Sequence, residues 1–80
     1  MMENNFTEPD LVMVFKTNLT DEKDVRQISI LLNAINIIIK WTVDLSDIDR
    51  VLRIEASEIQ PLKIIELVAA AGYGCEELTD

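Results

Sequence analysis

The sequence has 80 residues, of which 49% are hydrophobic and 28% are charged, and this composition predicts one small folded domain with a modest core. Fifteen acidic residues against seven basic ones give a formal net charge of −8 at pH 7. Because this charge repels a phosphate backbone and an anionic lipid surface, we expect neither nucleic acid nor a membrane as a partner.

The residue types that carry most enzyme and metal chemistry are scarce. The single cysteine, Cys75, cannot form an intrachain disulfide, and without histidine the chain lacks a Cys/His zinc set. It also lacks a Ser/His/Asp or Cys/His set and a glycine-rich phosphate loop, so we expect no enzyme and no cofactor. The first residues do not read as a secretory signal, and we expect a cytoplasmic protein.

The first half of the chain predicts a leader, a strand and a helix. Residues 1–9 are polar up to Pro9, so we expect a flexible leader before a single domain over residues 10–80. Apolar side chains alternate with others from Leu11 to Leu19, which is the period of a strand with one buried face. Cap candidates and negative charge around Asp21 then predict a helix that runs to about Asn36. Its apolar stripe comprises Val25, Ile28, Leu32 and Ile35, widened by Ile30 and Leu31.

The second half predicts a hairpin, a helix and an edge strand. The β-branched residues of 38–45 and the alternation over 50–55 predict two strands joined by a turn with Ser46, Asp47 and Asp49. Gln60 and Pro61 suit the N-cap and the first position of a second helix, which ends at Gly72. Its apolar stripe comprises Leu62, Ile64, Ile65, Val68 and Ala69. With a short strand over 73–78, the order predicts an α+β, ferredoxin-like sandwich: a four-stranded antiparallel sheet with two helices on one face.

Four short stretches add a more specific signal. They are Phe15-Lys16-Thr17-Asn18-Leu19, Trp41-Thr42-Val43-Asp44-Leu45, Val51-Leu52-Arg53-Ile54-Glu55 and Ala71-Gly72-Tyr73. Over about residues 11–78 the chain resembles the heavy-metal-associated (HMA) domains of small copper-carrier proteins. The resemblance implies the ferredoxin-like fold and a binding module of copper-chaperone type, which we expect to be bacterial.

The chain departs from the family in two segments. In HMA domains the loop after the first strand holds two cysteines, separated by two residues, whose thiolates bind Cu(I). The resemblance places Asp21 and Asp24 at these positions, so hard carboxylates replace soft sulfur ligands and we expect Cu(I) carriage to be lost. Ile37 stands where the family has a glycine before the second strand. Because a β-branched residue is strained at positive φ, we expect a rebuilt connection there.

The acidic residues of the loop and Cys75 each allow two interpretations. Asp21, Glu22 and Asp24 favour helix capping, because a helix N-terminus repels cations and Lys23 lies among them, but a hard divalent cation is the alternative. For Cys75, packing in the core competes with a role as a leftover thiol ligand.

A third set of residues predicts a contact surface. Val12, Val14 and Val51 alternate away from the predicted core, toward the sheet face that no helix covers, and Ile37 and Ile39 add apolar surface at one end. Such surfaces commonly mark contacts with a partner or with a second copy. We therefore predict a non-enzymatic HMA-like module that has lost soft-metal binding and acts by protein contact or self-association.

Overall fold

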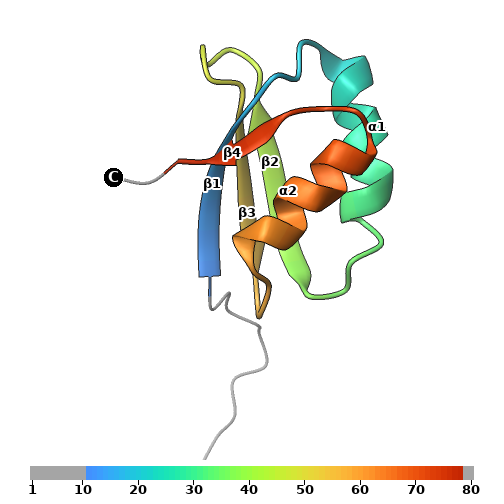
Figure 1. The fold of residues 1–80 in the computed structure, drawn as a ribbon, viewed down its shortest axis with the longest axis vertical. Coiled ribbons are helices and arrows are strands. Elements are labelled where there is room, and N and C mark those ends of the chain that lie inside the picture. Colours follow the sequence, from blue (N-terminus) through green and yellow to red (C-terminus); the bar gives the residue numbers. More distant parts are fainter. Residues whose placement is uncertain (1–10, 79–80) are drawn as a thin grey trace, which may run out of the picture.

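The computed structural model describes residues 11–78, and the leader predicted over 1–9 lies outside them. The elements are β1 (Leu11–Thr17), α1 (Glu22–Leu32), β2 (Ile38–Asp44), β3 (Val51–Ala56), α2 (Pro61–Ala70) and β4 (Cys75–Glu77). They form one antiparallel sheet in the order β2-β3-β1-β4, with both helices on one face (Figure 1). The predicted ferredoxin-like fold is confirmed.

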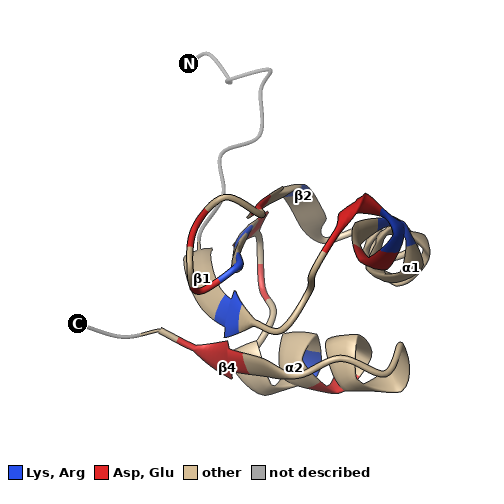
Figure 2. Ribbon diagram, turned by 90° about the horizontal axis from the view of Figure 1, so that it is seen from above, with Lys and Arg blue, Asp and Glu red and all other residues tan. Residues whose placement is uncertain are grey.

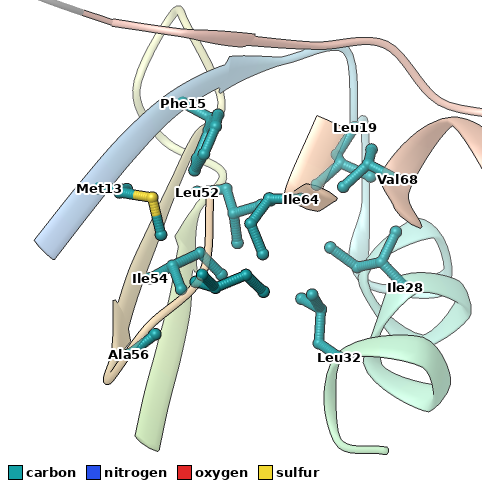
Figure 3. Packing of buried hydrophobic residues seen from close by; sticks show 11 residues of the cluster. Met13, Phe15, Leu19, Ile28, Leu32, Leu52, Ile54, Ala56, Ile64 and Val68 are labelled. Atoms are coloured by element: carbon teal, nitrogen blue, oxygen red, sulfur yellow. The ribbon is translucent and has the colours of Figure 1, made fainter. Parts of the chain in front are cut away.

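The core lies between the sheet and the two helices (Figure 3). Alternate residues of β1 and β3 point toward the helices. Each helix packs against them with two buried residues four positions apart, the spacing that keeps side chains on one helical face. The fully buried large side chains are Phe15, Leu19, Ile28, Leu32, Leu52, Ile54, Ile64 and Val68. Trp41 is half-buried against this cluster.

Two large side chains of the predicted apolar stripes are exposed instead. Ile30 in α1 is 71% exposed and Leu62 in α2 is 61% exposed. Each lies two residues from a buried residue of its helix, Ile30 from Ile28 and Leu62 from Ile64. Two residues turn a helix by about 200°, which directs the side chain away from the core. The predictions that Ile30 widens the first stripe and that Leu62 belongs to the second were wrong.

Three elements are shorter than predicted. β1 ends at Thr17 rather than Leu19, because the chain leaves the sheet there, although Leu19 still reaches the core. α1 ends at Leu32 rather than near Asn36, and the Asn33 side chain accepts a hydrogen bond from Trp41 Nε1 at 2.8 Å just beyond the helix. β4 covers only Cys75–Glu77, beside the last three residues of β1.

The end of α2 explains the short β4. Gly72 has a φ of 97°. Its N–H donates to the Ala69 carbonyl at 2.9 Å, and the Tyr73 N–H donates to the Val68 carbonyl at 3.1 Å. This pair of bonds is the Schellman motif, which requires a left-handed residue that glycine supplies without strain. Tyr73 is therefore held by the helix and does not join the strand.

The connection before β2 does without a glycine. Among residues 11–78, Arg50 is the one non-glycine residue with positive φ, so Ile37 avoids that strained region. The Ile38 N–H donates to the Ile35 carbonyl at 3.1 Å, and the Ile37 carbonyl accepts from the Ser57 N–H at 2.9 Å. Two backbone bonds thus close the connection, one within it and one from Ser57 in the connection after β3. No helix among the described residues is both long and apolar enough to cross a membrane.

Candidate functional site

Asp21 and Asp24, the two aspartates that the resemblance singled out, lie where β1 passes into α1. Asp21 is the N-cap of α1, and its Oδ1 accepts a hydrogen bond from the Asp24 N–H at 3.1 Å. Asp24 Oδ2 in turn accepts from the N–H of Thr20 at 2.8 Å and from its hydroxyl at 2.6 Å. Asp21 therefore caps α1, as the capping interpretation predicts. The Asp24 side chain instead binds Thr20, the residue before the N-cap.

Tyr73 occupies the other oxygen of Asp24 from across the fold. Its hydroxyl donates to Asp24 Oδ1 at 2.8 Å. The hydrogen bonds from Thr20, followed by the one from Tyr73, lower the pKa of Asp24 to about 2, and the same contact raises the pKa of Tyr73. Asp24 is therefore ionised at neutral pH, and both of its oxygens are engaged within the chain.

Thr17 and Arg50 form hydrogen bonds with the loop between β1 and α1. The buried Thr17 hydroxyl donates to the Arg50 carbonyl at 2.6 Å and accepts from the Leu19 N–H at 3.3 Å. Arg50 Nη1 donates to the Thr20 carbonyl at 3.0 Å and lies 3.4 Å from the Leu19 carbonyl. The turn between β2 and β3 thus holds the loop in place, although Arg50 has a φ of 46°.

Cys75 lies on the core side of the sheet. It pairs with Thr17 in the register of β1 and β4 and packs against the core cluster. Burial raises the pKa of its thiol to about 11. Since the thiolate is the form that binds soft metals, a protonated, half-buried thiol is a poor ligand. The structure favours the packing interpretation of Cys75.

The described residues offer no assembled metal centre. No group of three or more His, Cys, Asp or Glu side chains within residues 11–78 is placed to hold a metal ion. Glu22 is exposed on the first turn of α1 and does not complete a set with the two aspartates. The alternative of a hard divalent cation therefore finds no ligand set within this part of the chain.

The surface candidates divide into two groups. On the open face, Val12 is opposite Glu55, Val14 is opposite Arg53, and Val51 is opposite Asp44. Because Arg53 and Glu55 form an ion pair on this face, the three valines do not make one continuous apolar patch.

Ile37 and Ile39 form the second group. They lie near the start of β2, and each is 39% exposed. An apolar groove lies at this end, between Leu11, the connection 33–37 and the connection 57–60. We therefore call it the groove end. The loop end, with residues 18–24, 44–50 and 71–74, lies at the opposite side of the fold (Figure 1).

Sequence reasoning missed three residues of the loop site: Thr17, Arg50 and Tyr73. Tyr73 carried a signal, since it belongs to the Ala-Gly-Tyr stretch after the second helix. Thr17 looked like an ordinary core position of a strand, and nothing in the sequence marks Arg50 as a left-handed residue that contacts a loop 30 positions away.

Comparison with known proteins finds similar solved structures but no matching family model or curated sequence. Among solved structures, the yeast copper transporter domain Ccc2a, studied in apo and Cu(I)-loaded states, is similar with a TM-score of 0.74 and 18% identity, over 86% of this chain and 96% of that one. The apo HMA domain of the copper chaperone for superoxide dismutase gives a TM-score of 0.74 and 12% identity, over 99% and 79%. The chain has the fold of the HMA domains.

A third structure, the Atx1-Cu(I)-Ccc2a complex, is similar with a TM-score of 0.72 and 20% identity, over 86% of this chain and 96% of that one. The HMA fold here carries a single cysteine, Cys75. The pair of thiolates expected for Cu(I) is therefore missing from the chain. Asp21 caps α1 instead, and the Asp24 carboxylate accepts hydrogen bonds from Thr20 and Tyr73.

Proposed function

We propose that this chain is a non-enzymatic, cytoplasmic HMA-like module that has lost Cu(I) carriage and acts by protein contact. One observation carries the proposal: both oxygens of Asp24 are engaged by Thr20 and Tyr73. In a thiolate site the metal would connect the two ligand positions. Here hydrogen bonds connect them, so the loop is closed without any ion.

Protein contact is supported by what the scaffold retains. The comparison with the Atx1-Cu(I)-Ccc2a complex shows that proteins with a similar fold bind other proteins. This chain keeps the HMA fold and exposes apolar side chains at the groove end, where burial against another surface would be favourable. A second candidate function, the binding of a hard cation, has no comparable observation in its favour.

The loss of metal binding is tested by native mass spectrometry of the reduced protein with Cu(I), Zn²⁺ and Ca²⁺. We expect the protein without metal in each case. The double variant Asp21→Cys and Asp24→Cys is expected to gain one Cu(I) per chain, because the resemblance to HMA domains assigns the two ligand cysteines to these positions. Asp21→Cys alone is the matched control with one thiol fewer. Stoichiometric Cu(I) on the unmodified chain would overturn the proposal.

Protein contact is tested by a photo-crosslinking amino acid placed at Ile39 in cells, with the same group at Ile48 as the control. Ile48 is 91% exposed at the tip of the turn between β2 and β3, at the loop end. We expect a discrete crosslinked product from position 39 and not from position 48. If neither position gives a product, the contact part of the proposal fails.

A further inference from the structure

The groove end contains an apolar groove that the loop site does not use. The groove has a volume of about 610 Å³. Its walls are the apolar side chains of Leu11, Ile35, Ile37 and Ile59, and its rim carries Glu58, Gln60 and Lys63. It lies where β1 begins, where α1 connects to β2 and where β3 connects to α2. The start of β1 and two connections thus place apolar residues around one hollow.

Further apolar surface adjoins this groove. Leu11 and Ile37 of the groove are each 39% exposed, and so is Ile39, two residues beyond Ile37. Leu11 pairs with Ala56, which pairs with Ile38, so the ends of three strands meet here in register. Contiguous exposed apolar residues with polar residues at their edge are typical of interaction sites.

The charges of the molecule decide which end a second copy can approach. Six of the eleven acidic residues in the described part of the chain lie in 21–24 and 44–49, and only Lys23 is basic within these two segments. Figure 2 looks down on this loop end and shows the acidic residues there. Two copies that met through their loop ends would repel each other. The groove rim, by contrast, carries one acidic residue and one basic residue, Glu58 and Lys63.

We propose that the groove end is the interface of a symmetric homodimer, and this inference rests on the proposed protein-contact function. A twofold contact uses the same patch on both copies, so the patch must be self-complementary. The mixed rim meets that requirement, because a twofold axis that passes between Glu58 and Lys63 brings Glu58 of each copy to Lys63 of the other. The apolar walls would be buried between the copies, and the two acidic loop ends would point away from each other.

Sedimentation velocity tests the dimer. A standard interface buries about 800 Å² on each partner, and a patch centred on one groove is smaller, so we expect a weak dimer. The apparent mass should therefore be measured at protein concentrations from about 10 µM to about 500 µM. We expect the apparent mass to double across this range. Ile37→Asp should hold the protein at the monomer mass, whereas Ile48→Asp, an equal change at the loop end, should leave the dimer intact. Both positions are exposed, so both variants should fold, which circular dichroism checks.

The rim charges provide a sharper test. Glu58→Lys and Lys63→Glu should each weaken self-association at least tenfold at low salt, because each variant places like charges across the twofold axis. A mixture of the two variants should form a heterodimer, since every rim pair is then of opposite charge. Failure of the mixture to associate, or loss of the dimer in Ile48→Asp and not in Ile37→Asp, would overturn the proposed interface.

The outcomes separate this inference from the function on which it rests. A monomer at every concentration, together with a metal-free protein and a crosslinked product from position 39, overturns the homodimer but leaves a contact module for a different protein. Stoichiometric Cu(I) on the unmodified chain overturns the proposed function whatever its oligomeric state.

Discussion

The buried hydroxyl of Thr17 is expected to hold the loop site together, and Thr17→Val tests this. Valine has nearly the same shape, so the change removes the hydroxyl without opening a cavity. It leaves the Arg50 carbonyl and the Leu19 N–H without their partner. A buried polar group that loses its partner costs about 1–3 kcal/mol. Since the second bond is long at 3.3 Å, we expect a loss of about 2–3 kcal/mol in the free energy of unfolding.

For a domain of this size, 1 kcal/mol corresponds to about 4–8 °C in Tm, so Thr17→Val should lower Tm by about 10–20 °C. Urea unfolding followed by circular dichroism, with an unchanged m-value, gives the free energy directly. Thr17→Ser is the matched control: it keeps the hydroxyl and loses one buried methyl group, which costs about 1 kcal/mol. If Thr17→Val is no less stable than Thr17→Ser, the hydroxyl does not hold the loop.

Three further predictions concern titrating groups. Because folding lowers the pKa of Asp24 from 3.8 to about 2, its stabilising effect is complete above about pH 4 and is lost as the pH falls toward 2, so the stability difference between the natural chain and Asp24→Asn should shrink in that range. Tyr73→Phe should raise the pKa of Asp24, as measured by carboxyl NMR titration, and an unchanged pKa would contradict the assigned contact. Since burial raises the pKa of Cys75 to about 11, iodoacetamide at pH 8 should alkylate the folded protein far more slowly than the protein in urea, whereas equal rates would show an accessible thiolate.

The sequence alone determined the features that depend on neighbours along the chain. The two-residue period of β1 and the cap at Asp21 each involve residues within four positions of one another. The same is true of the proline at the start of α2 and the glycine after it. Backbone sterics and helix-end hydrogen bonding act over that distance, so the order of elements could be predicted. The ferredoxin-like arrangement followed from that order and from the resemblance to HMA domains.

Side-chain direction was harder to predict within an element. Ile30 and Leu62 are apolar and lie two residues from a buried residue of the same helix, yet they are exposed. Their apolar side chains favour burial, but each helix packs against the core with one face only. Ile28 lies on that face of α1 and Ile64 on that face of α2. Where the chain holds more apolar residues than the core can accept, only packing decides which of them stay at the surface.

The loop site was decided by the tertiary structure. The sequence placed Asp21 and Asp24 at the positions of two metal ligands, and it indicated capping. It did not indicate that Tyr73, 49 residues after Asp24, donates to the remaining oxygen, or that Arg50 reaches the loop carbonyls from the turn between β2 and β3. These contacts arise because the antiparallel sheet and the end of α2 bring three distant connections to one end of the fold. Hydrogen bonds of this kind depend on distances of a few tenths of an ångström, which no local pattern in the sequence encodes.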